Sequence, residues 1–476
     1  MMQNKQKVLA VDLDGTLLRS DLLYESACYK LSISFFYLFQ MIKYVFSGKA
    51  NFKARLAQGF EFDPALLPFR HSVIDFVKQG RSDGAHTVLI SASNQHLVSQ
   101  IAEFLECFDE AFGSDDKTNL KGVNKAKFLV DKYGVNGFDY VGDSIADIPV
   151  WKEADKILIA GASKRVIKKV SYIFSYYECI EEPLNSKISY VKTLRPHQWL
   201  KNLLVFAPLI AAHSIEFEEW FAGFIGFIAF NLISSSVYVL NDLLDLAADR
   251  QHPRKRIRPF AAGDVPIKFG LLTIPVLILL GVFVASNLPS TFALVLAAYF
   301  VITLFYSFFL KRRALVDIIT LTGLYTLRVI AGAAATGLLL SPWIVAFCLF
   351  LFLALAAIKR QTELVSNLSL GQLGTIGRDY RVDDLLIIVM IALSSGCISV
   401  LVFALYINSP VVLSLYSSPW FLWGACPVLL YWIIRLVLLA HRGEMHDDPV
   451  IFATKDTVSL FCGAIIVICG VFGSIV

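Results

Sequence analysis

The sequence predicts two architectures in one chain: an α/β domain with a mainly parallel sheet, then an all-α polytopic membrane bundle of about nine transmembrane helices. Of the 476 residues, 56% are hydrophobic, and the mean hydropathy is +0.61, which is typical of a membrane protein. The long apolar runs occupy the C-terminal part, whereas the N-terminal part alternates short apolar strands with amphipathic helices. We place the boundary near Pro183, which predicts domains at 1–182 and 183–476.

The membrane domain is predicted from nine apolar segments, some of them shorter than the roughly 20 residues of a straight crossing. They lie at about 199–214, 219–240, 269–287, 290–309, 315–339, 343–358, 384–407, 420–440 and 457–475. Lysine and arginine occur in alternate loops, at 241–268, 311–313, 359–383 and 441–456, and are absent from the loops between them. The positive-inside rule therefore predicts a multi-pass protein of the cell's inner membrane, with the charged motifs in the cytoplasm and the C-terminus outside.

Two further features concern the compartment of the N-terminal domain. The first residues, MMQNKQKVLAVDLDG, pass directly into a strand-like segment and predict no signal peptide. The eight cysteines include no C-x-x-C pair, so they indicate neither a zinc site nor a disulfide framework. We expect this domain to stay in the cytoplasm.

The first chemical motif follows the strand Lys7–Val11 and reads Asp12-Leu-Asp14-Gly-Thr-Leu. Asp12, at a strand end beside a glycine turn, can attack phosphorus as a carboxylate nucleophile. Asp14, two residues later, can act as the general acid for the leaving oxygen. The motif predicts phosphoryl transfer to an aspartate.

Three further motifs follow in order. Ser91 ends an apolar strand, Lys121 lies in NLKG with Lys125 as a second candidate, and Asp143 and Asp147 form a G-D-x-x-x-D pattern. Together with the first motif they resemble the haloacid dehalogenase (HAD) superfamily of phosphatases, which implies a Rossmannoid fold. The resemblance implies phosphate binding by Ser91 and Lys121. It assigns Mg²⁺ to a set of four aspartates, Asp12, Asp14, Asp143 and Asp147.

Residues 19–65 stand where this superfamily places a cap. The segment Leu31–Phe46 is rich in aromatic residues and is followed by basic ones. We expect a cap helix packed on the domain core, and the alternative is an interfacial helix lying on the membrane surface.

The stretch from Asn241 to Pro259 is the second chemical motif. Asn241, Asp242, Asp245 and Asp249 are spaced three and four residues apart, so on a helix they project from one side. Carboxylates in this arrangement can hold Mg²⁺ shared with substrate phosphates. The basic residues that follow can take phosphate oxygens, and Lys255 and Arg258 are the candidates. The alternative is a polar helix end, which we disfavour because carboxylates at a helix C-terminus oppose the macrodipole.

This pattern, N-D-x-x-D-x-x-x-D-x-x-H-P-x-K-x-x-R-P, resembles the first aspartate-rich motif of the UbiA superfamily of membrane prenyltransferases. The segment Arg195–Pro208, RPHQWLKNLLVFAP, is similar to the branch that contains decaprenyl-phosphate phosphoribosyltransferases. The resemblance begins near Ile188, runs to the C-terminus and implies a substrate contact for Lys201.

The family's second acidic motif corresponds to Tyr306, Lys311 and Asp317. A D-x-x-x-D pair would need an acid at position 321, which is Leu321. The resemblance assigns Asp317 to metal binding, and Tyr306 and Lys311 to the substrate. The phosphoribosyltransferase branch shows a similar reduction of its second acidic motif. The missing acid at position 321 therefore favours that branch.

Three cations in or beside apolar segments are further candidates. Arg328 lies deep in such a segment, where an arginine is costly, so we expect a phosphate or carboxylate partner, with a structural ion pair as the alternative. Lys359 and Arg360 could contact diphosphate, or their side chains could simply reach the interface. Near the last apolar segment, Asp447, Asp448 and Asp456 are either a further metal contact or loop charges.

We interpret the chain as a bifunctional Mg²⁺-dependent membrane enzyme. Its bundle would transfer phosphoribose from phosphoribosyl pyrophosphate to a polyprenyl phosphate, and its HAD domain would dephosphorylate the product. One alternative is a conventional UbiA prenyltransferase that moves an isoprenoid from its diphosphate to an aromatic or other acceptor. The other is a non-catalytic lipid-binding or transport bundle. No nucleic-acid partner is expected.

Overall fold

The computed structural model describes residues 7–46, 49–115, 118–180, 187–371, 374, 378–445 and 448–475. It divides into two compact units. The first contains Met1–Thr193 with Val239–Thr273, and the second contains Leu194–Tyr238 with Ile274–Val476. The boundary expected near Pro183 lies outside the described residues.

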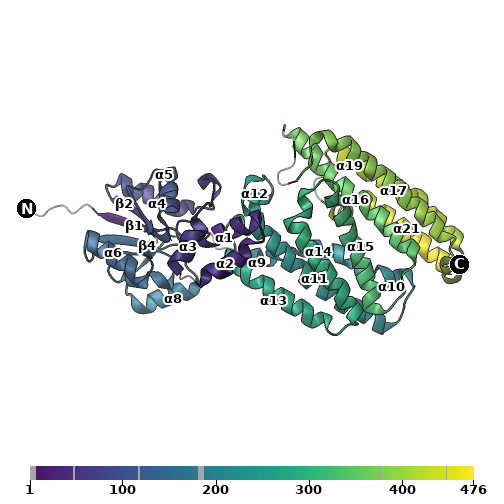
Figure 1. Cartoon of the computed structure of the whole chain (residues 1–476), viewed down its shortest axis with the longest axis horizontal. Coiled ribbons are helices and arrows are strands. Elements are labelled where there is room, and N and C mark those ends of the chain that lie inside the picture. Colours follow the sequence, from purple (N-terminus) through teal and green to yellow (C-terminus); the bar gives the residue numbers. More distant parts are fainter. Residues whose placement is uncertain are drawn as a thin grey trace, which may run out of the picture. The chain divides into compact units, whose positions relative to one another are not determined.

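A six-stranded parallel sheet organises the first unit (Figure 1). Its order is β3-β2-β1-β4-β5-β6. The strands are β1 Val8–Asp12, β2 His86–Asn94, β3 Glu110–Ser114, β4 Phe138–Gly142, β5 Ile157–Ile159 and β6 Glu178–Cys179. Because β1 pairs with both β2 and β4, the carboxyl ends of these three strands meet at one edge. The predicted α/β class is confirmed.

Helices cover both faces of this sheet. Alternate strand residues enter two separate cores, one containing Val11 and Leu89 and the other Ala10 and Val88. The covering helices are α4 His71–Ser82, α5 Gln95–Leu105, α6 Val123–Tyr133, α7 Ile148–Trp151 and α8 Lys164–Ile173. They leave the carboxyl edge of the sheet for the site.

The cap region forms three helices, α1 Leu22–Ile33, α2 Tyr37–Val45 and α3 Lys49–Ala57, followed by the turn η1 Pro64–Leu66. Asp21 caps α1, accepting a hydrogen bond from the backbone N–H of Leu23. The expected helix over 31–46 is split, because Ser34 adopts an extended conformation that ends α1.

The first unit also contains α9 Lys187–Thr193 and the segment from Val239. That segment holds the end of α11 Phe217–Leu244, then α12 Leu246–Gln251 and η4 Lys255–Ile257, and the start of α13 Ile267–Ala285. The aspartate-rich stretch therefore belongs to the same compact unit as the HAD-like domain.

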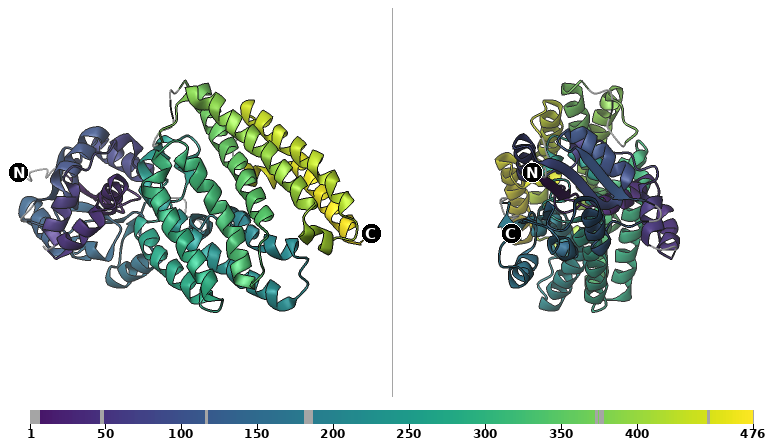
Figure 2. Two further views of the ribbon diagram at one scale, coloured as in Figure 1. Left: turned by 45° about the vertical axis from the view of Figure 1, so that its right-hand side comes forward. Right: turned by 90° about the vertical axis from the view of Figure 1, so that its left-hand side faces the viewer.

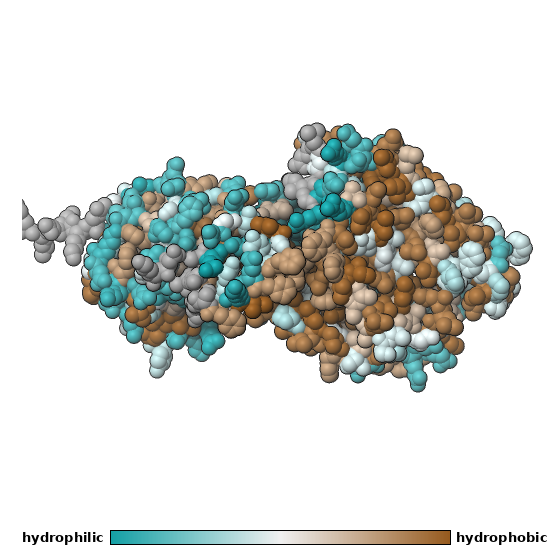
Figure 3. Space-filling view, in the orientation of Figure 1, coloured by the Kyte–Doolittle hydropathy of each residue, from teal (hydrophilic) through white to brown (hydrophobic). Residues whose placement is uncertain are grey.

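Eight helices of the described chain are long and apolar enough to cross a membrane. Two of them are α11 and α13, and the others are α14 Ser290–Phe308, α15 Val316–Thr336, α16 Pro342–Ser369, α17 Leu385–Ile407, α19 Ala425–His441 and α21 Thr457–Ile475. The turns η6 Val382–Asp384 and η7 Pro419–Gly424 extend α17 and α19 at their N-termini. Figure 2 shows the long helices of the second unit side by side, and apolar residues dominate the face of this unit seen in Figure 3. The predicted helical membrane bundle is confirmed.

The expected span at 199–214 takes a different form. It folds as a 3₁₀-helix, η3 Pro196–Phe206, followed by the short helix α10 Ala207–Ala211. η3 packs closely on α15, since a Cβ added at Gly332 would lie 1.9 Å from the carbonyl oxygen of Val205. The short helices α18 Pro410–Leu415 and α20 Pro449–Ala453 and the turn η5 Leu310–Arg312 complete this unit.

Candidate active sites

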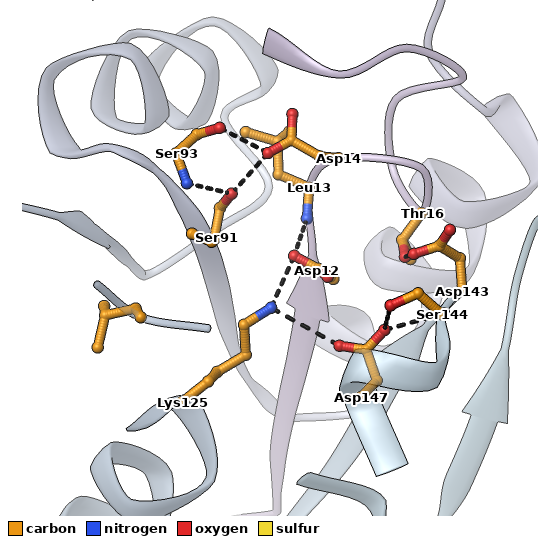
Figure 4. Close-up of polar contacts among 12 residues, drawn as sticks. Asp12, Leu13, Asp14, Thr16, Ser91, Ser93, Lys125, Asp143, Ser144 and Asp147 are labelled. Carbon is orange, nitrogen blue, oxygen red and sulfur yellow. Dashed lines mark hydrogen bonds and ion pairs between the residues drawn. The ribbon is translucent and has the colours of Figure 1, made fainter. Parts of the chain in front are cut away.

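Three carboxylates meet at the carboxyl edge of the sheet (Figure 4). Asp12 ends β1, Asp143 follows β4, and Asp147 lies in the turn η2 Ile145–Asp147. One oxygen from each lies within 4.8 Å of the others. Hard oxygen ligands at this spacing suit Mg²⁺. The backbone comes close to this cluster at Gly15, whose φ is +81° and where a Cβ would lie 2.5 Å from an Asp143 oxygen.

A buried lysine completes the cluster. The Nζ of Lys125 lies 2.8 Å from Asp12 Oδ1 and 3.8 Å from Asp147 Oδ1, as Figure 4 shows. The sequence analysis preferred Lys121, but Lys121 is exposed and precedes α6. Lys125 lies on the first turns of α6 and points to the cluster, so the structure favours the second candidate.

Burial and charge determine the protonation of this cluster. Burial raises the pKa of Asp12 to about 7, against the opposing effect of Lys125. Burial also holds the pKa of Asp143 well above its usual range, and Asp147 adds to this effect. Burial alone would lower the pKa of Lys125, but the charges of Asp12 and Asp147 outweigh it and raise that pKa. The site thus concentrates negative charge that a cation would stabilise.

Asp14 lies apart from the three carboxylates. Its Oδ2 accepts hydrogen bonds from the hydroxyls of Ser91 at 3.0 Å and Ser93 at 2.6 Å. Its Oδ1 accepts one from the backbone N–H of Leu22 at 2.8 Å. Asp14 therefore joins strand β2 to the first cap helix, α1. Ser93 was not singled out from the sequence, although it lies two residues after Ser91 on β2.

The aspartate-rich stretch is not one continuous helix. α11 ends at Leu244 and α12 begins at Leu246, with Asp245 between them at φ −98° and ψ 13°. Asp242 and Asp249 are both buried, whereas Asn241 and Asp245 are half-buried. The side-chain oxygen of Asn241 has no hydrogen-bond partner among the described residues.

Arg258 joins the two buried carboxylates. Its Nη1 lies 3.2 Å from Asp242 Oδ1 and 2.6 Å from Asp249 Oδ2. Burial raises the pKa of Asp249 to about 6, against the effect of Arg258. Asp242 and Asp249 would be the residues to hold a divalent cation here, and Arg258, beside them, would be placed to contact phosphate oxygens. Lys255 lies on the exposed turn η4.

A buried ion pair connects this stretch to the cap. The Arg250 guanidinium donates to both oxygens of Glu25, at 3.1 and 2.6 Å, and to the carbonyl oxygen of Ala261 at 3.0 Å. Ser20 also donates to Glu25. Neither Glu25 nor Arg250 was identified from the sequence, because no local pattern reveals a pair so far apart in the chain.

In the second unit, Asp317 is held by two partners. Tyr306 donates a hydrogen bond to Asp317 Oδ1 at 2.8 Å, and Arg360 Nε lies 2.5 Å from Asp317 Oδ2. Asp317 and Arg360 are almost wholly buried, and Arg360 also pairs with Glu363. The half-buried Lys311 lies on η5.

Arg328 lies on α15 with Asp317, as expected, but its hydrogen-bond partners are neutral. It donates to Asn202 Oδ1 at 2.8 Å, to the Leu324 carbonyl and to the Tyr299 hydroxyl at 3.1 Å. Aromatic rings, among them Tyr325, lie beside its guanidinium. Among the salt bridges of the described residues none involves Arg328, so a carboxylate partner or structural ion pair is not seen there. A phosphate partner stays a prediction.

The Asp448 carboxylate forms ion pairs with two lysines that were predicted to contact phosphate. Lys201 Nζ lies 2.7 Å from Asp448 Oδ2, and Lys359 Nζ lies 2.9 Å from the same oxygen. The Tyr325 hydroxyl is 3.4 Å away. Burial acts to raise the pKa of Asp448, but the two lysines outweigh it and lower that pKa. Asp448, left undecided in the sequence, is thus the buried centre of an ionic cluster.

The other acids near the last span behave differently. Asp456 pairs with Arg435 through two contacts, of 2.6 and 3.1 Å. The neighbouring Asp447 lies outside the described residues.

Comparison with known proteins accounts for both units. Residues 203–462 match the model of the UbiA prenyltransferase family, and residues 9–152 match that of haloacid dehalogenase-like hydrolases. The uncharacterised protein y4nM of Sinorhizobium fredii is 36% identical over 96% of this chain and 89% of its own length. The nodulation protein NoeC of Azorhizobium caulinodans is 35% identical over 58% of this chain and 90% of its own.

A decaprenyl-phosphate phosphoribosyltransferase of Mycolicibacterium smegmatis is 37% identical over 38% of this chain and 59% of its own length. This similarity is therefore partial. The family model, by contrast, spans more than half of the chain. The chain is a multi-pass membrane protein that belongs to the UbiA prenyltransferase family and carries a haloacid dehalogenase-like hydrolase domain at its N-terminus.

Proposed function

We propose that the membrane domain transfers a phosphoribosyl group from phosphoribosyl pyrophosphate to a polyprenyl phosphate. In this reaction a phosphate oxygen of the lipid attacks C1 of the ribose, the bond from C1 to the diphosphate oxygen breaks, and inorganic diphosphate leaves. The product is a lipid-linked ribose that keeps its 5-phosphate. The reaction takes place on the cytoplasmic side of the inner membrane.

The environment of Asp317 is the observation that carries this choice. By the resemblance described above, a prenyl diphosphate enzyme of this family has a second acidic motif with a D-x-x-x-D pair. Here the second motif has one acid, and that acid is buried in contacts with Arg360 and Tyr306. Arg258, which holds Asp242 and Asp249, is partly exposed, whereas Arg360 is buried with Asp317. Asp317 is therefore less suited than those two acids to hold a metal ion, which favours the phosphoribosyltransferase branch.

The aspartate-rich stretch provides the groups that hold the diphosphate. Asp242 and Asp249, with Asn241 and Asp245 beside them, would bind Mg²⁺. When bound, Mg²⁺ neutralises charge on the diphosphate as it leaves. Arg258, released from the two carboxylates, would contact the diphosphate oxygens. In the second unit, Lys201 and Lys359 are the candidate contacts of the lipid phosphate.

We further propose that the HAD-like domain removes the 5-phosphate. Asp12 attacks the phosphorus, the bond from phosphorus to the sugar oxygen breaks, and Asp14 gives that oxygen a proton. Water then hydrolyses the aspartyl phosphate and releases inorganic phosphate. Lys125 stabilises the negative charge at Asp12 and on the transferred group. The carboxylates Asp12, Asp143 and Asp147 would hold Mg²⁺.

Mass spectrometry of the lipid products tests both steps. The purified full chain is incubated with Mg²⁺, phosphoribosyl pyrophosphate and a polyprenyl phosphate. The parent should yield dephosphorylated ribosyl lipid, Asp12→Asn should yield the 5-phosphorylated lipid, and Asp242→Asn should yield neither. If no sugar is transferred while both substrates remain intact, and an isoprenoid diphosphate is instead consumed with an aromatic acceptor, the conventional prenyltransferase reaction replaces this proposal.

A further inference from the structure

The cap helix α2 turns an apolar face outward. The most exposed large side chains of α2 and its two cap residues are Phe36 at 68%, Phe39 at 59%, Ile42 at 53% and Phe46 at 86%. They recur every three or four residues and therefore share one side of the helix. Met41, on the opposite side, is buried. The preferred expectation, a cap helix packed on the domain core, thus describes only one of its two faces.

The cap that carries this face is tied to the hydrolase site. α1 begins at Leu22, whose N–H binds Asp14. α3 returns to the site through Lys53, which donates to the carbonyl oxygen of Ala92 on β2 at 3.0 Å. Lys30 of α1 also donates to the Arg55 carbonyl oxygen at 2.6 Å. α2 therefore connects two helices that both contact the catalytic edge of the sheet.

We propose that this apolar face of α2 lies in the surface of the lipid bilayer. The same compact unit contains the cytoplasmic ends of two membrane-spanning helices, the last turns of α11 and the first turns of α13. It also contains α9, whose Tyr190 packs edge-on against Phe269 of α13, with ring centroids 4.9 Å apart. α9 exposes Ile188 and Val191. The unit is thus held at the bilayer by its own residues.

Charge supports the bilayer over a second copy of the chain. Lys43 and Arg55 are exposed beside the apolar face, and Arg55 lies over the ring of Tyr44. Basic residues flanking an aromatic face suit anionic lipid headgroups. Two copies meeting through this face would bring the same positive charges together.

This inference rests on the proposed function where it concerns the substrate. An apolar cap at the bilayer surface would present the hydrolase site to a phosphate monoester whose carrier lies in the membrane. The substrate class of the HAD-like domain is therefore a lipid-linked sugar phosphate, and a freely soluble metabolite has no need of such a cap.

Depth-dependent quenching tests the membrane contact without reference to activity. The full chain, with the exposed Cys179 and Cys397 changed to serine, is labelled with an environment-sensitive fluorophore at Phe39→Cys and placed in nanodiscs holding one chain each. Doxyl-labelled lipids should quench this fluorophore strongly. The matched control is Asp131→Cys on the exposed side of α6, which should be quenched little. Equal, weak quenching at both positions would overturn the proposal. In separate nanodiscs that hold two chains, contact between the two labels, without quenching by lipid in the single-chain discs, would also overturn it.

A second measurement separates this inference from the proposed function. The double variant Phe39→Glu/Ile42→Glu is compared with Gln40→Glu on the same helix. Hydrolysis of soluble p-nitrophenyl phosphate should be unchanged in both, whereas hydrolysis of vesicle-embedded ribosyl lipid phosphate should fall about tenfold only in the double variant. Full activity of the double variant on the embedded lipid would refute the role of α2. A parent enzyme inactive on that lipid would instead refute the proposed phosphatase step, while the quenching result would still decide the membrane contact.

Discussion

The Arg250 guanidinium holds the Glu25 carboxylate through two hydrogen bonds, of 3.1 and 2.6 Å, in a contact from which water is almost excluded. Arg250 directly follows Asp249 of the aspartate-rich stretch. Glu25 lies within one turn of Leu22, whose N–H binds Asp14 of the hydrolase site. Only α1 and α12 therefore separate Asp14, the proposed general acid of one candidate site, from Asp249, a proposed metal ligand of the other.

Removing one member of this pair should damage both folding and transfer. Glu25→Gln or Arg250→Gln leaves a buried charge without its partner, which costs about 3–5 kcal/mol. We expect a lower unfolding temperature of the detergent-solubilised chain and a lower rate of sugar transfer. Arg81→Gln is the control, because its pair with Asp109 is more exposed and should cost less than about 1 kcal/mol.

Replacing both members separates stability from positioning. In Glu25→Met/Arg250→Met the cavity stays filled and no charge is left unpaired, so we expect the unfolding temperature to recover. The transfer rate should stay low, because Arg250 also holds the carbonyl oxygen of Ala261 and with it the loop that carries Arg258. If the transfer rate recovers as well, the pair only stabilises the fold.

The two lysines of the third hydrolase motif should behave differently. Lys125→Met removes the charge 2.8 Å from Asp12 and should lower the phosphatase rate about 10²-fold, the usual loss for one electrostatic contact to the reacting group. Lys121→Met, at an exposed position, should change that rate little. Release of inorganic phosphate by the two variants provides the comparison, and equal losses would contradict the geometric assignment.

Asp448→Asn should destabilise the membrane domain. Lys201 and Lys359 would face each other without the carboxylate that now contacts both, at a cost of about 3–5 kcal/mol. In the matched variant Asp456→Asn the carboxylate removed is more exposed than that of Asp448, and its pair is with Arg435, so the effect should be smaller. Unfolding temperatures in the same detergent decide the order, and a larger effect at Asp456 would argue against Asp448 as the centre of the cluster.

Glu110 predicts a specific pH dependence of stability. Burial acts to raise the pKa of Glu110, but hydrogen bonds from Tyr133 and Lys132 outweigh burial and lower this pKa from 4.5 to about 2. A lowered pKa means that the unfolded chain takes up the proton first. The stabilisation is therefore complete above about pH 4.5 and is lost as the pH falls towards 2.

Glu110→Gln should accordingly lower the free energy of unfolding by about 1–2 kcal/mol at neutral pH. The difference in unfolding temperature between this variant and the parent should shrink between about pH 5 and about pH 3. A difference that does not change over this range would show that the carboxylate charge is not the stabilising element.

The parts of the sites that follow from local pattern could be predicted. Asp12, Asp143 and Asp147 each follow or flank a short apolar strand, and parallel strands bring their carboxyl ends to one edge. The choice between Lys121 and Lys125 could not be made in this way. It depends on where α6 begins, and Gly122, at φ 59°, directly precedes that helix, so that Lys125 rather than Lys121 points inward.

Contacts distant in sequence were beyond prediction. Asp448 meets Lys201 across 247 positions, and no periodicity or spacing links them. The break at Asp245 was also missed, because four polar residues spaced by three and four fit a continuous helix equally well. Tertiary packing decides such features, and the pattern of residues describes only one helix at a time.

The run from η3 into α10 bears on the predicted orientation of the chain in the membrane. Eleven residues of 3₁₀-helix at about 2.0 Å each, followed by five of α-helix at about 1.5 Å each, reach about 30 Å when laid end to end, the thickness of the hydrocarbon layer. The eight long apolar helices of the described residues alone would form an even number of passages and would return the chain to the face on which it started. With this tightly wound segment as a ninth passage the number becomes odd, and we expect the two termini on opposite sides of the membrane.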